Sequence, residues 1–302
     1  MDPAPSEAEL ILLAGPTASG KTALALRLAE RLGAEIVSAD SQQVYRYFDI
    51  GTAKPSAAEL ARVRHHLVSV VEPNERFSAA QFQRLADAAI ADIRGRAKRV
   101  LVVGGTGLYL RILLHGVISA PGANTKLRQQ LEEEAARKGT AALHQQLAQV
   151  DPATAAEVKP TDLVRIIRAL EIHQSTGVAV SEQRRRHRFM ENRYPFVLYV
   201  LSPPRDELYC AIDERAKAMF AGGLLDEVRS LVQRGFRDVA PMRSVNYVQA
   251  LAVVEGRMRL EEGIASAAQQ SRRYAKRQLT WFRKEAGAKH LSPPYGELDA
   301  QL

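Results

Sequence analysis

The stretch Leu10-Ile11-Leu12-Leu13-Ala14-Gly15-Pro16-Thr17-Ala18-Ser19-Gly20-Lys21-Thr22 decides the fold of this chain. Its first five residues are apolar, and residues 15–22 satisfy the phosphate-loop pattern G-x-x-x-x-G-K-[ST] in full. An amphipathic helix is predicted to follow at residues 22–32. In this strand–loop–helix context, backbone N–H groups and the helix dipole bind phosphate oxygens. The pattern therefore predicts a site for a di- or triphosphate, in which Lys21 reaches the terminal phosphate and the Thr22 hydroxyl binds Mg²⁺.

Composition places the chain among globular proteins. It has 302 residues, of which 46% are hydrophobic and 25% charged, and its apolar runs fall short of the roughly 18 residues that span a bilayer. The polar, acidic residues 1–9 do not form a signal peptide. We therefore expect a cytoplasmic protein without a membrane segment, and a monomer. The single cysteine, Cys210, excludes an internal disulfide and is predicted to be a small apolar filler.

Strand and helix patterns alternate over the first 118 residues. Apolar runs at 10–14, 35–39 and 100–103 predict strands, and a run at 196–201 predicts a further strand later in the chain. This pattern predicts an α/β fold, a P-loop NTPase-like, doubly wound parallel sheet. Between the strands predicted at 100–103 and 196–201, helical patterns predict an inserted all-helical domain at residues 120–192. The α/β core then comprises residues 1–119 and 193–302. Further helices are predicted at 78–94 in the core, and at 126–138, 140–149 and 162–174 in the insertion, with Gly139 and Gly177 as helix stops.

Polar residues follow two of the predicted strands. Asp40 comes after the second strand, where a parallel sheet binds ligands, so it is a candidate general base or outer-shell partner of Mg²⁺. It could also simply cap the next turn. The third strand ends in Gly104-Gly105-Thr106-Gly107 rather than in the aspartate that many phosphate-loop NTPases place there. This ending argues against NTP hydrolysis and offers further N–H and hydroxyl donors beside the phosphate loop.

Basic segments favour a nucleic-acid substrate. The net charge is +8 and the sequence pI is about 9.7. Arg165 and Arg168 share the polar face of the helix predicted at 162–174, although a solvated, salt-bridged face would look the same. A dense run follows at residues 184–188, and residues 272–284 interleave cations with Tyr274 and Trp281. Such a mixture is typical of sites for single-stranded RNA, although Trp281 is predicted to be a core residue.

Together these segments resemble the tRNA isopentenyl transferase family, the bacterial tRNA dimethylallyltransferases. The matching stretches follow one another nearly from end to end: GPTASGKT (15–22), DSQQVYRYFDIGTAKP (40–55), HHLVSVVEP (65–73), GGTGLYL (104–110), DLVRIIRALEIHQSTG (162–177), GGLLDEVRSL (222–231) and YAKRQLTWFRK (274–284). The combination of DIGTAKP, RALE and KRQLTWFR is specific to this family. The resemblance implies transfer of a dimethylallyl group from its diphosphate to N6 of adenosine 37 of tRNA, next to the anticodon.

The resemblance also implies roles for individual residues. Asp40 matches the family's base, Thr106 matches a residue near the reacting centre, and Arg215 matches an arginine that contacts the diphosphate, so the catalytic set is Asp40, Thr106, Lys21 and Arg215. Mg²⁺ is the expected cofactor, with Thr22 as its ligand. The target base is expected to flip out of the anticodon loop. The expected tRNA contacts are Asp40, Ser41, Gln42, Gln43, Thr106, Arg128, Val164, Arg165, Ile166, Ile167, Arg168, Arg243, Lys276 and Arg277.

The chain departs from the family pattern at a few positions. Where the family commonly has Arg-x-x-Gly-Tyr-Arg, this chain has Arg243-Ser244-Val245-Asn246-Tyr247-Val248. Asparagine tolerates a left-handed backbone, so the turn is expected to survive, whereas Val248 removes an RNA contact. Ala211 stands where an arginine is frequent, which leaves more of the diphosphate binding to Arg215.

Other functions remain open at the level of sequence. An enzyme that prenylates free adenine nucleotides would need the core but little of the long basic insertion. A phosphate-loop kinase for a small metabolite would require an arginine-bearing lid and fits the Gly-Gly-Thr strand end poorly. A non-catalytic RNA-binding protein would not need Asp40 and Thr106 beside an intact phosphate loop.

Overall fold

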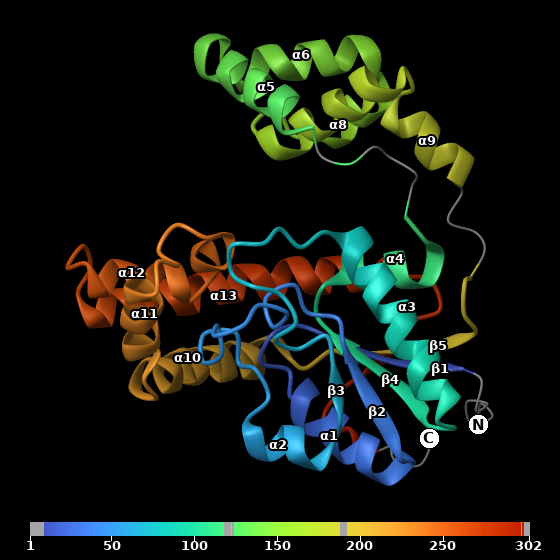
Figure 1. Cartoon of the computed structure of the whole chain (residues 1–302), viewed down its shortest axis with the longest axis vertical. Helices are drawn as coiled ribbons and strands as arrows, with labels where there is room; N and C mark the ends of the chain where they lie inside the picture. Colours follow the sequence, from blue (N-terminus) through green and yellow to red (C-terminus); the bar gives the residue numbers. More distant parts are fainter. Residues whose placement is uncertain (1–8, 118–121, 123, 188–191, 297, 299–302) are drawn as a thin grey trace. The chain divides into compact units, whose positions relative to one another are not determined.

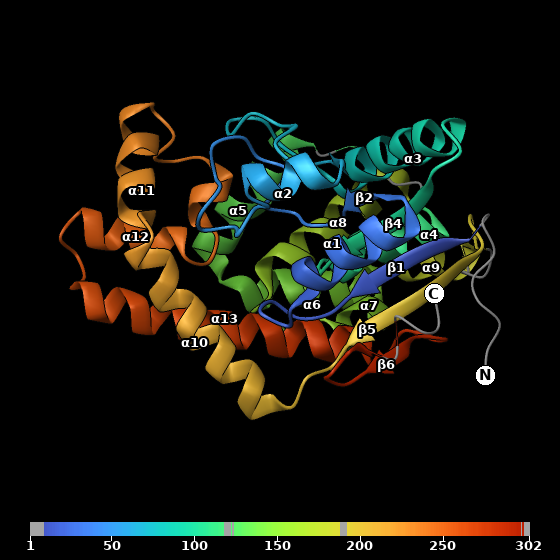
Figure 2. The same ribbon diagram turned by 90° about the horizontal axis from the view of Figure 1, so that it is seen from below.

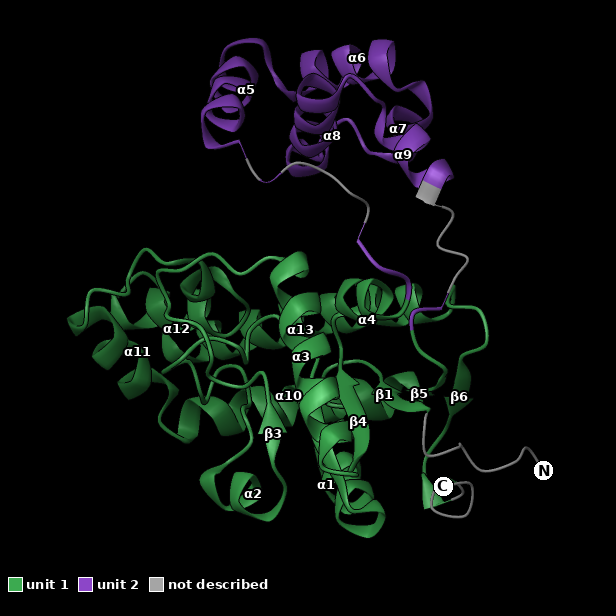
Figure 3. Ribbon diagram, turned by 45° about the vertical axis from the view of Figure 1, so that its right-hand side comes forward, with its two compact units in different colours: residues 1–114, 194–302 green, residues 115–193 purple. Residues whose placement is uncertain are grey.

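The computed structural model describes residues 9–117, 122, 124–187, 192–296 and 298. The chain divides into two compact units, unit 1 (Met1–Leu114 and Tyr194–Leu302) and unit 2 (His115–Arg193), which are coloured separately in Figure 3. The insertion boundary predicted at residues 119 and 120 lies outside the described residues, as does Arg188 of the basic run.

Unit 1 is built on a parallel sheet whose strand order is β3-β2-β4-β1-β5-β6 (Figure 1). The central strand β1 ends at Ala14, which pairs with Gly104 of β4 on one side and with Val200 of β5 on the other. The α/β fold with a doubly wound parallel sheet is confirmed. Strands β3 and β6 were not predicted because they are too short to carry a pattern. The strands are β1 (Leu10–Ala14), β2 (Ala34–Ser38), β3 (His65–His66), β4 (Arg99–Gly104), β5 (Phe196–Leu201) and β6 (Lys289–Leu291).

Helices cover both faces of the sheet because successive side chains of a strand point to opposite faces. Leu10 and Leu12 of β1 pack with side chains of α3 and α4, whereas Ile11 and Leu13 pack with side chains of α1. Serine caps begin α2 and α3, through Ser56 and Ser78. These helices are α1 (Lys21–Leu32), α2 (Ala57–Arg62), α3 (Ala79–Gly95) and α4 (Gly107–His115).

A group of C-terminal helices forms a separate core beyond one end of the sheet. Figure 2 shows α10 and α13 side by side, with α11 and α12 next to them. Their buried residues pack against Val44, Tyr45 and Phe48 of the segment that follows β2, so they support the loop that carries Asp40. The elements are α10 (Arg205–Ala221), α11 (Leu224–Gln233), a 3₁₀ turn (Ala240–Arg243), α12 (Tyr247–Val254) and α13 (Leu260–Phe282).

All the secondary-structure elements in the described part of unit 2 are helices. Leu131, Leu143, Ile166 and Leu170 are among the residues that fill its core. Gly139 and Gly177 end the preceding helices with positive φ angles of 85° and 69°, as predicted. The helices are α5 (Thr125–Lys138), α6 (Thr140–Val150), α7 (Pro152–Glu157), α8 (Leu163–Thr176) and α9 (Val180–His187).

Two further expectations concern the surface. The prediction that Cys210 is a buried filler is wrong, because its position on α10 faces solvent. Within the described ranges, none of the helices is long and apolar enough to cross a membrane.

Candidate active site

The phosphate loop runs from the end of β1 into α1, as the sequence predicts. Gly20 precedes the helix with φ 82°, a left-handed conformation that favours glycine. The first backbone N–H groups of α1 have no acceptor within the helix, so they are available to an anion. The Ser19 hydroxyl is buried and has no hydrogen-bond partner among the described residues. An unpartnered buried donor inside this loop is what a phosphate oxygen would satisfy.

Positive charge is concentrated beside the loop. The pKa of Lys21 is lowered to about 7, first because its ammonium group is removed from water and then because Arg215 of α10 lies nearby. Burial also lowers the pKa of Arg215. Asp40 opposes both shifts. A bound anion would therefore stabilise the charged forms of Lys21 and Arg215.

Asp40 lies just beyond β2, at the carboxyl edge of the sheet. Its Oδ1 accepts hydrogen bonds from the backbone N–H groups of Gln42, at 2.8 Å, and Gln43, at 3.2 Å. Asp40 therefore does cap the following turn, but both of these bonds use Oδ1. The capping role and a role as base are thus compatible, because the second carboxylate oxygen takes no part in either bond.

Thr106 links the turn after β4 to the turn that carries Asp40. Its Oγ1 accepts a hydrogen bond from the Ser41 N–H at 3.2 Å, and its own N–H donates to the Ala39 carbonyl at 3.4 Å. Tyr274 of α13 lies near the Thr106 side chain. Burial and the nearby Asp40 carboxylate raise the pKa of Tyr274 to about 12. The sequence placed Tyr274 among residues for stacking on RNA, with no signal for its place beside Thr106.

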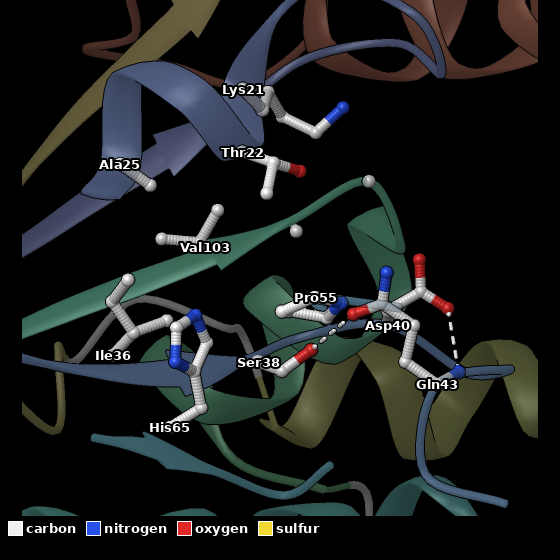
Figure 4. A pocket seen from close by; sticks show the side chains of 12 residues that line it. Lys21, Thr22, Ala25, Ile36, Ser38, Asp40, Gln43, Pro55, His65 and Val103 are labelled. Carbon is white, nitrogen blue, oxygen red and sulfur yellow. Dashed lines mark hydrogen bonds between the residues drawn. The ribbon is translucent and has the colours of Figure 1, made fainter. Parts of the chain in front are cut away.

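A cavity lies between the phosphate loop and the turn that carries Asp40 (Figure 4). Lys21, Thr22 and Asp40 line its polar part. The rest of its lining is mixed: Ala25, Ile36, Pro55 and Val103 are apolar, whereas Ser38, Gln43 and His65 are polar. A smaller cavity lies between the phosphate loop and the C-terminal helices, and the residues that line it include Thr17, Arg215 and Asn246.

The other predicted site residues of unit 1 occupy two regions. Ser41, Gln42 and Gln43 form the turn after Asp40, and the Gln43 Nε2 group donates to the Ala53 carbonyl at 3.1 Å. The Gln42 Oε1 atom is buried without a hydrogen-bond partner among the described residues. On the C-terminal helices, the predicted tRNA contacts Arg243, Lys276 and Arg277 are all exposed.

Asn246 adopts the left-handed backbone expected of it, with φ 77°. Its Nδ2 group donates to the Gly51 carbonyl at 2.8 Å, and the Tyr247 hydroxyl accepts from the Gly51 N–H at 3.1 Å. The segment around Gly51 belongs to the DIGTAKP stretch. Asn246 therefore keeps the turn and also helps to hold this stretch in place.

In unit 2 the predicted tRNA contacts on α5 and α8 differ in accessibility. Val164 and Arg165 are exposed, with 79% of the Val164 residue and 69% of the Arg165 side chain accessible. Arg128 and Arg168 both pair with Glu171, a carboxylate that is 1% exposed. The side chains of Ile166 and Ile167 lie in the core of the unit. A side-chain contact of these two isoleucines with RNA is therefore not available, because the apolar face of α8 packs inward.

Trp281 packs as the sequence predicted. It lies against the core on the α3 and α4 side of the sheet, and a Cβ atom at Gly107 would collide with its ring. The guanidinium of Arg111 lies 4.2 Å from the ring centroid. Its role is structural, since it supports the helix that begins at Gly107.

Comparison with known proteins agrees with this site. The family model described as IPP transferase matches residues 43–285. A tRNA dimethylallyltransferase of Myxococcus xanthus is 65% identical over 95% of this chain and 93% of its own length, and one from Anaeromyxobacter dehalogenans is 56% identical over 95% of each.

Solved structures give the same result. The tRNA isopentenylpyrophosphate transferase of Bacillus halodurans has a TM-score of 0.70 and 38% identity, covering 97% of this chain and 94% of its own. A eukaryotic dimethylallyltransferase acting on tRNA has a TM-score of 0.79 and 26% identity, covering 97% of this chain and 76% of its own. The phosphate loop, the strand-end residues and the basic helices thus occur in a chain that belongs to the IPP transferase family.

Proposed function

We propose that this chain transfers a dimethylallyl group from dimethylallyl diphosphate to tRNA, at N6 of adenosine 37, and releases diphosphate. The observation that carries this proposal is the position of Asp40 in the same cavity as Lys21 and Thr22 of the phosphate loop, with apolar side chains such as Ile36 and Val103 also in the lining. Family membership supports the same reaction, because the relatives carry the name tRNA dimethylallyltransferase. The diphosphate is the leaving group, so no nucleotide triphosphate need be consumed.

The chemistry follows from the charges. The bond between C1 of the dimethylallyl group and the diphosphate oxygen breaks, the bond between N6 and C1 forms, and a proton leaves N6. Lys21 and Arg215 stabilise the negative charge that builds on the departing diphosphate. Asp40 accepts the N6 proton, which matters because an exocyclic amine is a poor nucleophile. Thr106 holds the turn that carries Asp40, because its Oγ1 accepts the Ser41 N–H, and we propose that its side chain also helps to orient the amine.

Mg²⁺ fits this site if most of its ligands are diphosphate oxygens and water rather than protein side chains. In the described part of the chain, no group of three or more His, Cys, Asp or Glu side chains could hold a metal ion. Thr22 lines the cavity beside Lys21, and Mg²⁺ usually binds few protein ligands together with phosphate oxygens and water. When bound, it would neutralise part of the diphosphate charge. We propose Thr22 as its protein ligand.

We propose that tRNA contacts both units. In unit 1, the turn 41–43 lies next to the general base Asp40. The exposed side chains of Arg243, Lys276 and Arg277 add positive charge to the surface of this unit. In unit 2, Val164 and Arg165 offer exposed side chains at the start of α8. The ion pair of Arg128 with Glu171 joins α5 to α8, whereas the pair of Arg168 with Glu171 lies within α8. Both arginines therefore support the surface as well as adding charge to it.

The alternatives are disfavoured by the same observations. An adenine-nucleotide prenyltransferase has no use for a separately folded unit of 79 residues, the span His115–Arg193. A kinase would use a nucleoside triphosphate, whereas the turn after β4 carries Gly105 and Thr106 instead of the aspartate that many phosphate-loop NTPases place there.

One assay tests the proposal. Purified protein is incubated with unmodified tRNA, labelled dimethylallyl diphosphate and an excess of AMP. We expect label in tRNA, at the adenosine next to the anticodon. Label in AMP and none in tRNA would show that the acceptor is a free nucleotide. In a parallel reaction with labelled ATP, phosphate transfer would show a kinase.

A further inference from the structure

Gln278 of α13 joins two loops of the active site. Its Oε1 atom accepts a hydrogen bond from the Thr17 N–H in the phosphate loop, at 2.9 Å. Its Nε2 group donates to the Gly105 carbonyl in the turn after β4, also at 2.9 Å. The side chain is 6% exposed, and a Cβ atom at Gly105 would collide with its carboxamide. Gln278 is therefore a buried polar residue with both ends of its amide engaged.

The position of this bridge is informative. Strands β1 and β4 are paired as far as Ala14 and Gly104. Beyond these residues the two segments separate, one into the phosphate loop and the other into the turn that contains Gly105. A carboxamide carries one acceptor and an N–H donor, as a peptide group does. Gln278 thus replaces the missing backbone partner between the two diverging chains, just where the substrate site begins.

Further hydrogen bonds connect the Gln278 side chain to the turn that carries the general base Asp40. Gly105 is followed by Thr106, whose Oγ1 accepts the Ser41 N–H beside Asp40. A connected series of hydrogen bonds and short backbone steps therefore runs from the loop that binds diphosphate, through Gln278 and Thr106, to the turn that holds Asp40.

We propose that Gln278 is a positioning residue, which fixes the spacing between the diphosphate in the phosphate loop and the base Asp40 across the cavity. This inference rests on the function proposed above. Gln278 acts through the Thr17 N–H and the Gly105 carbonyl, so it aligns the reacting groups without touching them. Misplacement of reacting groups by about 1 Å can cost about 10²-fold in rate, so loss of the bridge should affect the transfer step itself.

The first test replaces Gln278 with methionine, which has similar length and no hydrogen-bonding amide. For Gln278→Met we expect kcat/KM for dimethylallyl diphosphate to fall by about 10²-fold, with a fall in kcat at saturating tRNA. The dissociation constant for tRNA should stay within about two-fold, because the cations of α13 are unchanged. The matched control is Gln269→Met, at an exposed position of the same helix, which should behave as the wild type.

The second test separates positioning from mere stability. In Gln278→Glu, the ionised carboxylate would accept from Thr17 but repel the Gly105 carbonyl, whereas the neutral acid can both accept and donate. Burial raises the pKa of such a carboxyl, so the ratio of variant to wild-type kcat should rise as the pH falls from about 8 to about 5.5. This ratio is informative even where Gln278→Met folds poorly.

The outcomes are distinct. The positioning role would be overturned if folded Gln278→Met had the kcat of the wild type. It would also be overturned if the ratio of kcat in Gln278→Glu to kcat in the wild type did not change with pH. Calorimetric binding of dimethylallyl diphosphate is measured alongside, and weaker binding to Gln278→Met is expected. A wild-type protein that binds the diphosphate but modifies no tRNA would contradict the proposed function instead, and the binding data would still test Gln278.

Discussion

Arg215 of α10 lies close enough to Lys21 of α1 to help lower the pKa of this lysine to about 7. The two residues are far apart in the sequence, and the C-terminal helices bring them together beside the phosphate loop. Removal of Lys21 from water contributes more to the shift than Arg215 does. The free protein therefore holds this lysine in a state whose charge depends on pH near neutrality, and an anion would restore the charge.

This relationship predicts proton uptake when the diphosphate binds. Because the pKa of free Lys21 is about 7, much of it is neutral at pH 8, and a bound anion raises its pKa. Diphosphate affinity should therefore fall as the pH rises above about 7, with uptake of up to one proton per site at about pH 8. Calorimetry in buffers of different ionisation enthalpy measures the uptake. Lys21→Arg stays charged and should remove it, and unchanged uptake in that variant would refute the assignment.

Asp40→Asn tests the base. Asparagine keeps an Oδ1 acceptor for the Gln42 and Gln43 N–H groups, so the turn should persist. Loss of the proton acceptor should lower the transfer rate by about 10²–10⁴-fold, with little change in tRNA affinity. Single-turnover kinetics with labelled dimethylallyl diphosphate measure the rate. Asp206→Asn, at an exposed position of α10, serves as the control, and near-wild-type transfer by Asp40→Asn would exclude it as the base.

Arg165→Ala tests the RNA surface of unit 2. The side chain is 69% exposed and pairs only loosely with Asp162, at 3.5 Å, so stability should barely change. A lost phosphate contact should weaken tRNA binding and reduce the slope of affinity against salt concentration by about one. Filter binding at several salt concentrations measures this slope. Arg229→Ala on α11 also breaks an exposed pair with an aspartate three residues away, and it should leave the slope unchanged.

Arg128→Ala should behave differently from Arg165→Ala. It removes one of the two arginines that neutralise Glu171, which is 1% exposed. Leaving part of a buried charge unpaired should lower the free energy of unfolding of unit 2 by about 1–3 kcal/mol. Urea unfolding followed by circular dichroism measures this change. If Arg128→Ala kept the wild-type free energy of unfolding but bound tRNA more weakly, Arg128 would contribute to tRNA binding and not to stability.

Asn246 allows a test of the turn before α12. Asn246→Ala should destabilise the protein by about 1–3 kcal/mol, because φ 77° strains alanine and the hydrogen bond to the Gly51 carbonyl is lost. Asn246→Gly loses the same bond but accepts this backbone, so the change should stay within about 1 kcal/mol. Chemical denaturation compares the two variants. Equal losses would mean that the hydrogen bond, and not the backbone, makes asparagine suitable here.

Much of the fold was predictable from local patterns. The apolar run before the phosphate loop, its glycines and the following helix predict β1, the loop and α1, because each depends on residues close in sequence. β3 and β6 were not predictable, since strands of two or three residues carry no periodicity and exist only by pairing with β2 and β5.

The sequence by itself determined the phosphate loop, the parallel sheet and the candidate base Asp40, because backbone geometry and strand ends are encoded locally. Only the tertiary structure decided which distant residues complete the site. It places Arg215 beside Lys21, Tyr274 beside Thr106, and Gln278 between the Thr17 N–H and the Gly105 carbonyl. It also shows that Ile166 and Ile167 face inward. Such contacts arise from packing between elements far apart in the chain, and a local pattern carries no information about them.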